Sequence, residues 1–169
     1  NPSSKVVYLT FDDGPIPECT PQVLDILSQH GVKATFFMVG ENAERYPELV
    51  ARVRFEGHAV GNHTYHHLKG YKMCTHTHLF RPPHGRMKYS QKKKLRELGC
   101  TIYLWDVLTH DYNPCYSVEK MLSVVKRYTR NGSIIVMHDS LKSKDRMLQL
   151  LPQMIDWLHA EGYKCETLP

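Results

Sequence analysis

Apolar runs alternate along this chain with segments whose apolar residues recur at helical spacing, and this alternation restricts the fold more than any other feature. The first run, Val6–Phe11, has the pattern of a strand that is covered on both faces of a parallel sheet. We expect about seven strands, at residues 6–11, 34–39, 58–61, 79–80, 101–105, 133–137 and 163–166. We expect helices between most of them, at residues 21–30, 44–55, 90–98, 118–130 and 145–160. The alternation predicts an α/β fold with a parallel sheet, either open or closed into a barrel.

The size and composition of the chain favour one folded domain, residues 1–169. Hydrophobic residues make up 41% of the chain, and no stretch approaches the roughly 18 consecutive apolar residues of a membrane span. The first residues show no signal-peptide pattern. The net charge is +5, and the basic residues are scattered along the chain. Their one dense run, Lys92–Lys94, is expected on a solvated helix face. Nucleic acid is therefore not an expected partner.

Five cysteines are spread along the chain without a CxxC spacing. An odd number distributed in this way argues against a complete disulfide framework or a structural zinc knuckle, and leaves room for one bridge. The unusual count is histidine, with 11 residues, several of which cluster.

Two adjacent acids, Asp12 and Asp13, follow the first expected strand in the stretch "TFDDGP". In an α/β fold, the loops at the carboxyl ends of the strands carry the chemistry. A turn would explain Asp-Gly, because both residues favour turns, but a turn does not need two acids. A bound cation would offset the repulsion between the two carboxylates.

The stretch "NHTYHH" follows another expected strand and contains His63 and His67. Histidines four positions apart point to the same side of a helical turn and suit a metal such as zinc. Taken alone, this spacing indicates two surface histidines more often than a metal site. One of the two aspartates could supply a third ligand and leave a coordination position open for water, while the other serves as a base.

Three more expected strands end in groups that can take part in catalysis. Arg81 in "FRPPHG" could hold a carboxylate in a bidentate pair, and "WDVLTHDY" supplies Asp106 and Asp111. His138 in "IIVMHDS" could act as a general acid. Each has a simpler interpretation by itself, as a turn arginine or a structural histidine, but together they indicate an active site.

These blocks, "TFDDGP", "HTYHH", "RPPHG", "WDVLTHDY" and "IVMHD", closely resemble in sequence and order the polysaccharide deacetylase family, carbohydrate esterase family 4. The resemblance implies a distorted (β/α) barrel with about seven parallel strands. It implies removal of acetyl groups from N-acetylglucosamine polymers or acetylated xylan with a divalent metal, commonly zinc. An acetylated polysaccharide or oligosaccharide would be the partner, and the location would be extracytoplasmic.

Carried over by position, the resemblance implies that Asp13, His63 and His67 bind the metal. It makes Asp12 the general base for the attacking water and His138 the general acid for the leaving amine.

The remaining implied roles surround this centre. Arg81 would orient Asp12 and would itself be held by an acid of the fourth block. The backbone N–H near His84 would stabilise the oxyanion, and Tyr112 would contact substrate. In this family the fourth block has two acids followed by Trp, whereas here the first acid position is Leu108. Because Asp106 lies two residues too early, Asp111 is the preferred partner of Arg81.

Only 13 residues separate His67 from Arg81, roughly half of the family's usual connection. Either this member lacks a helix there, or residues are absent from the chain. We interpret His76 and His78 in this connection as surface residues.

The leading hypothesis is a zinc-dependent deacetylase acting on N-acetylglucosamine units of peptidoglycan or a chitin-like polymer. The alternatives are an acetylxylan esterase and a catalytically silent carbohydrate-binding domain. A scaffold with a structural metal is disfavoured, because such sites are usually closed by four protein ligands. Tyr65, Tyr112 and Trp105 could stack on sugars, although Trp105 is expected in the core.

Overall fold

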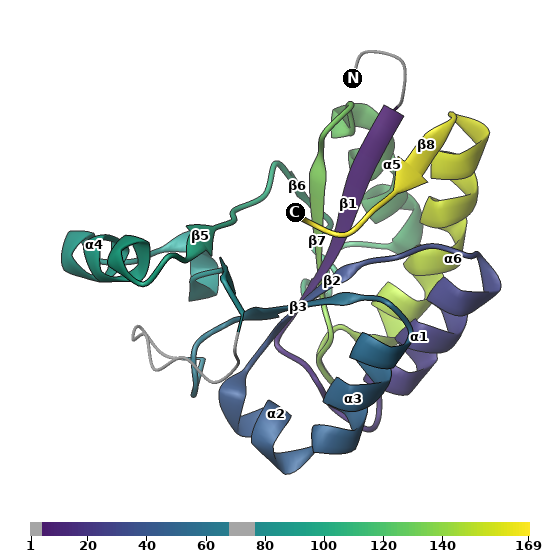
Figure 1. The fold of residues 1–169 in the computed structure, drawn as a ribbon. Coiled ribbons are helices and arrows are strands. Elements are labelled where there is room, and N and C mark those ends of the chain that lie inside the picture. The colour runs from purple at the N-terminus through teal and green to yellow at the C-terminus, as the bar shows by residue number, and fades with distance from the viewer. Residues whose placement is uncertain (1–4, 68–76) are drawn as a thin grey trace.

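The computed structural model describes residues 5–67 and 77–169, which form one curved, all-parallel sheet with helices packed on its outer side (Figure 1). The strand order is β5-β4-β3-β2-β1-β7-β6, and β8 pairs with the first half of β1. The strands are β1 (Lys5–Asp12), β2 (Thr35–Met38), β3 (Ala59–Asn62), β4 (Leu79–Phe80), β5 (Thr101–Ile102), β6 (Val107–Leu108), β7 (Ile134–His138) and β8 (Tyr163–Cys165). The helices are α1 (Thr20–Gln29), α2 (Gly40–Arg45), α3 (Pro47–Phe55), α4 (Tyr89–Glu97), α5 (Val118–Tyr128) and α6 (Lys144–Ala160), with a 3₁₀ turn at Pro83–Gly85.

The predicted fold class, a distorted (β/α) barrel, is confirmed, with three differences in its elements. The expected strand at residues 101–105 ends at Ile102, and a further short strand, β6, follows it, so the described residues form eight strands. The expected helix at residues 44–55 is two helices, α2 and α3, which meet at Tyr46. Pro47 explains this break, because proline cannot continue a helix but fits the first position of a new one.

The hydrophobic core lies between the sheet and helices α1, α5 and α6. Helix α6 buries six side chains at three- and four-residue spacing: Met147, Leu150, Leu151, Met154, Ile155 and Leu158. Full burial of such a side chain stabilises a fold by about 1.5–3 kcal/mol, so this one face anchors α6 firmly. Helix α4 packs instead on β5 at the far end of the sheet (Figure 1), where Lys92–Lys94 are exposed as expected.

Parallel pairing brings the carboxyl ends of the central strands to one edge. In the β1–β7 register Asp12 lies opposite His138, and in the β1–β2 register it lies opposite Phe37. Asn62, the last residue of β3, pairs with both Met38 of β2 and Phe80 of β4. The sheet therefore places the residues that follow β1, β3, β4 and β7 around a common centre.

Three further sequence predictions concern the cysteines, the surface histidines and membrane spans. Cys19, Cys115 and Cys165 are free thiols, while Cys74 lies outside the described residues, as does His76. His78 is exposed, as expected for a surface residue. In the part of the chain that the structure describes, no helix is both long enough and apolar enough to cross a bilayer.

Candidate active site

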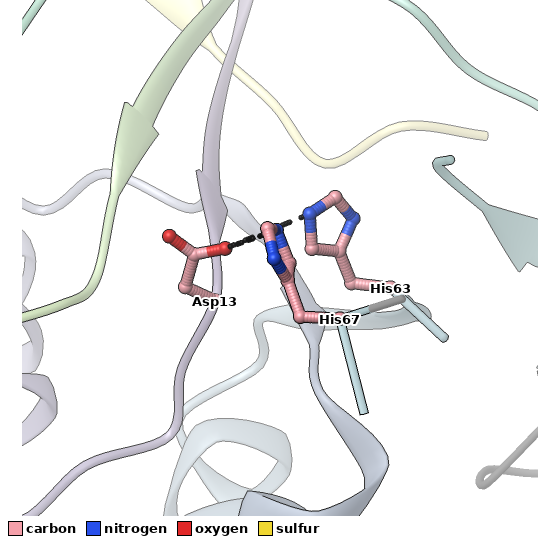
Figure 2. Close-up of side chains that lie close together, drawn as sticks. All are labelled: Asp13, His63 and His67. Carbon is pink, nitrogen blue, oxygen red and sulfur yellow. Dashed lines mark ion pairs between the residues drawn. The ribbon is translucent and has the colours of Figure 1, made fainter. Parts of the chain in front are cut away.

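Three side chains from two loops converge beyond the ends of β1 and β3 (Figure 2). Asp13 directly follows β1, and His63 and His67 come from the turn that follows β3. Five non-glycine residues have left-handed backbone, with φ between 53° and 80°: Asp13, Thr64, His67, His84 and His110. Such conformations cost about 1–3 kcal/mol each and cluster where function requires a particular side-chain direction. Here they turn Asp13 and His67 toward the same point.

The convergence has the dimensions of a metal site. The Oδ1 atom of Asp13 lies 3.6 Å from Nε2 of His63 and 3.1 Å from Nε2 of His67. The three ligand atoms all lie within 4.8 Å of one another. Ligand atoms held about 2 Å from one tetrahedral cation would stand roughly 3.3 Å apart, so a small divalent ion fits between them.

The chemistry of the donors fits a metal as well. His63 is buried, and its Nδ1 donates to the carbonyl of Arg81 at 2.9 Å, which leaves the Nε2 lone pair facing Asp13. The Oδ1 atom of Asp13 is buried and accepts no hydrogen bond from the described residues. A buried carboxylate oxygen without a donor is costly, and a cation would satisfy it. The group therefore fits a divalent ion bound by one carboxylate and two imidazoles.

The pKa values in this group follow from burial and from mutual attraction. Burial alone would raise the pKa of Asp13, but the contact with His67, followed by the charges of His138 and His63, lowers it. Contact with Asp13 raises the pKa of His67 against the effect of its partial burial. Burial lowers the pKa of His63, which favours the neutral imidazole that a metal needs.

Asp12 is held by a buried arginine. Its Oδ1 accepts a hydrogen bond from Nη1 of Arg81 at 2.8 Å, and Arg81 is fully buried. The rest of the guanidinium donates to the carbonyls of Tyr103 at 3.2 Å and Leu104 at 3.1 Å. The other carboxylate oxygen, Oδ2, lies 3.8 Å from Nε2 of His63 and so faces the three-residue cluster. Arg81 thus fixes one oxygen of Asp12 and leaves the other available to a reacting group.

His138 is hydrogen-bonded to a buried aspartate, on the side of β1 that lies opposite Arg81. Its Nδ1 lies 2.8 Å from Oδ1 of Asp111, and its backbone N–H donates to Oδ2 at 2.7 Å. Burial opposes protonation of His138, but the hydrogen bond and charge of Asp111, then the charges of Asp12 and Asp13, raise its pKa to about 9. This histidine is therefore protonated at neutral pH and suited to give up a proton.

These groups line one cavity of about 490 Å³. The three cluster residues, Asp12 and His138 form part of its wall, and the others are His84, Trp105, Leu108, Tyr112, Ser140 and Lys142. A cavity with a carboxylate, a protonated imidazole and a candidate metal cluster on its wall has the components of metal-assisted hydrolysis.

Comparison with known proteins identifies the family. A family model described as polysaccharide deacetylase matches residues 1–77. A peptidoglycan-N-acetylglucosamine deacetylase of Bacillus cereus is 33% identical over 188 residues, which cover 98% of this chain and 87% of that protein. The chain belongs to the polysaccharide deacetylase family.

Two more proteins show how far the likeness extends across this family of hydrolases. A chitooligosaccharide deacetylase of Bradyrhizobium is 31% identical over 200 residues, covering 98% of this chain and 90% of the relative. The crystal structure of the Bc1960 peptidoglycan N-acetylglucosamine deacetylase superposes with a TM-score of 0.92 at 34% identity. That superposition covers 99% of this chain and 87% of the Bc1960 chain, so nearly all of this chain shares the fold of that deacetylase.

The prediction that Asp111 is the partner of Arg81 in this deacetylase is wrong. Asp111 contacts His138, as described above, and Asp106 pairs with Arg130 at 3.2 Å and accepts from the N–H of Ile134 at 2.8 Å. The cause is strand order: Asp111 follows β6, which pairs with β7, whereas Arg81 follows β4 on the other side of β1. The acid of the fourth block therefore supports the histidine and not the arginine.

His84 and Tyr112 line the same cavity as the candidate metal cluster and His138. The ring of His84 is 5.2 Å from that of His67, and the ring of Tyr112 is 5.1 Å from that of His138. Trp105 was expected in the core but is only half-buried and lines the cavity. The ring of Trp105 packs against Gly85, where an added Cβ would approach it to 3.1 Å. Tyr65 instead donates to Glu44 of α2.

Two further residues near the site could not be recognised from the sequence. Arg146, in the first turn of α6, donates to the backbone carbonyl of Asp111 at 2.9 Å and to that of Lys142 at 3.1 Å. Lys142 lies in the loop before that helix and lines the cavity. Both look like ordinary surface cations in the sequence. Lys142 reaches the cavity from the loop that follows β7, whereas the packing of α6 beside the fourth block brings Arg146 to Asp111.

Proposed function

We propose that this protein hydrolyses the N-acetyl group of N-acetylglucosamine units in a polysaccharide, using a zinc ion held by Asp13, His63 and His67. One observation carries the proposal. The carboxylate of Asp12, which is hydrogen-bonded to Arg81, and the protonated ring of His138 line the same cavity as this cluster. The family and the names of the relatives, peptidoglycan and chitooligosaccharide deacetylases, support the same reaction.

A bound divalent cation would polarise the amide carbonyl and make a water molecule more acidic. Asp12 takes the proton of the attacking water through Oδ2, while Arg81 keeps Oδ1 in place. His138 then gives a proton to the amide nitrogen as the C–N bond breaks, because an amine leaves poorly unless it is protonated. The products are acetate and a free amino group on the sugar.

Two outer residues complete the proposal. His84 lies in the first turn of a short 3₁₀ segment, where backbone N–H groups have no partner within the helix. Among the described residues, no backbone carbonyl accepts from its N–H, so this group could stabilise an oxyanion, and the side-chain identity matters little. Tyr112 offers a ring beside His138 against which a sugar could pack.

The structure bears on the two alternatives. Ester hydrolysis in acetylated xylan releases an alcohol, which needs less help from a general acid. Asp111 accepts hydrogen bonds from both the ring and the backbone of His138, and the pKa of His138 is raised to about 9. A general acid positioned in this way favours the amide substrate. A silent binding domain would not need both a positioned base and a positioned acid, and both are present here.

We further propose that residues 1–169 form one deacetylase domain, since one buried cluster joins residues from Val7 to Leu158. The name of the peptidoglycan deacetylase relative supports an extracytoplasmic location, because peptidoglycan is a cell-wall polymer.

The decisive experiment measures acetate release from N-acetylglucosamine oligomers, peptidoglycan and acetylated xylan in parallel. We expect release from an N-acetylated substrate that chelation abolishes and zinc restores. Release from xylan alone would favour the esterase. No release from any substrate by protein that binds one zinc per chain would refute the deacetylase.

A further inference from the structure

The cavity wall carries a cation that the proposed reaction does not use. Lys142 lines the cavity, and its Nζ lies 5.6 Å from the centre of the Tyr112 ring. That ring is in turn 5.1 Å from the ring of His138. The Lys142 side chain is exposed, and within the described part of the chain no carboxylate forms an ion pair with it. Its charge is therefore available to whatever occupies the cavity.

The fold fixes the position of this lysine. The backbone carbonyl of Lys142 accepts a hydrogen bond from Nη2 of Arg146 at 3.1 Å. The carbonyl of Ser140 accepts from the N–H groups of Ser143 at 3.1 Å and Lys144 at 3.0 Å, which closes the loop as a tight turn before α6. Ser143 is fully buried. The lysine stands on a turn with a defined backbone, so its charge stays at this side of the cavity.

The charge is not needed to balance the acids of the site. Asp12 is already paired with buried Arg81, and Asp13 belongs to the candidate metal cluster. A cation at the wall of a partly enclosed cavity attracts anions and raises their local concentration. Because a neutral sugar gains little from this charge, the substrate that gains is one with a carboxylate near the N-acetyl group.

We propose that Lys142 selects an acetylated glycan that carries carboxylates on units next to the reacting sugar, which is the chemistry of peptidoglycan and not of chitin oligomers. This inference rests on the proposed deacetylation and identifies its substrate class. Peptidoglycan alternates N-acetylglucosamine with a sugar whose lactyl group ends in a carboxylate or in an acidic peptide, whereas chitin oligomers carry no charge.

The test uses a pair of substrates that differ only in charge: a soluble peptidoglycan glycan and the same glycan with its carboxylates converted to amides. For Lys142→Met we expect KM on the charged glycan to rise roughly three- to tenfold, the range for losing one exposed to half-buried charged contact. We expect kcat on both glycans, and KM on the amidated glycan, to stay near the wild-type values. Lys142→Arg should keep the preference, and the preference should weaken as salt is added.

The matched control is Lys126→Met, which removes the same charge from an exposed position in the last turn of α5. It should leave the KM ratio of the two glycans unchanged. If Lys142→Met raises KM equally on both glycans, the lysine only supports Tyr112, and the inference is wrong. A wild-type protein that treats the two glycans alike would also overturn it.

A binding measurement separates this inference from the proposed function. Titration calorimetry with zinc-loaded Asp12→Asn protein, with and without Lys142→Met, gives the affinity for each glycan without turnover. Tighter binding of the charged glycan that depends on Lys142 would support selection even if acetate release failed. Equal binding of the two glycans by protein that carries Lys142 would refute selection while leaving deacetylation to be judged by acetate release.

Discussion

Replacing Asp111 with asparagine should move the alkaline limit of activity toward neutral pH. Asp111 is the largest influence that keeps His138 protonated, and together with Asp12 and Asp13 it raises the pKa of His138 to about 9. The general acid must be protonated, so activity falls as pH rises through this pKa. From an ordinary value near 6.5, the difference corresponds to roughly 3 kcal/mol of preference for the protonated ring. Without the charge of Asp111, the burial of His138 opposes its protonation. The alkaline limit of activity should then fall below about pH 7.

The measurement is kcat/KM for acetate release between about pH 5 and pH 10, which reports the pKa values of the free enzyme. Asp106→Asn is the matched control, because Asp106 belongs to the same block but pairs with Arg130 near the surface. Its profile should follow the wild type. An alkaline limit that does not move in Asp111→Asn would refute the assignment of His138 as the acid.

The same pair contributes to stability in a defined pH window. Because the folded-state pKa of His138 lies above its unfolded value, the contribution is complete below about pH 6.5 and is lost as pH rises through about 9. The difference in Tm between wild type and Asp111→Asn should therefore shrink between about pH 6 and pH 10. A constant difference would mean that the pair stabilises the fold through the backbone contact alone.

Four further substitutions test the remainder of the site. Asp12→Asn should lower kcat by about 10²–10⁴-fold, while the zinc content measured by metal analysis stays at one ion per chain. His63→Ala should lose the zinc. If the Asp12→Asn protein contained no zinc, Asp12 would be a metal ligand. Arg81→Met should lower the free energy of unfolding, measured in urea, by about 3–5 kcal/mol, because the buried carboxylate of Asp12 loses its partner. A loss below about 1 kcal/mol would show that water replaces the arginine. Gly85→Ala should cost more than about 1 kcal/mol, since φ is +66° and the new Cβ meets Trp105 at 3.1 Å, whereas an unchanged Tm would show that the turn yields.

The sequence was sufficient to predict the part of the site that depends on strand ends. Each of Asp12, Asp13, His63 and His138 follows or ends a strand, and parallel strands present their carboxyl ends at one edge. The expectation that these residues meet followed from that rule and from the spacing of His63 and His67, whereas their roles came from the family resemblance.

The contacts of Asp111 could not be derived in the same way. They depend on which strands are neighbours, and β6, the strand before Asp111, has only two residues and no apolar run that would reveal it. Lateral strand order is decided by the packing of the whole sheet, which a local pattern does not contain. The half-buried position of Trp105 depends on the same short segment, since the chain leaves β5 after Ile102.

The left-handed residues around the cavity have a consequence for attempts to improve this protein. Thr64 combines φ of +66°, unfavourable for a β-branched side chain, with a buried hydroxyl that has no partner among the described residues. Thr64→Gly would relieve both problems, and a selection for heat resistance alone would favour this position and its left-handed neighbours. The same selection would loosen the turn that directs His63 and His67. Laboratory evolution of thermostability should therefore assay metal retention in every round, because the easiest gains lie in the loop that holds the proposed metal ligands.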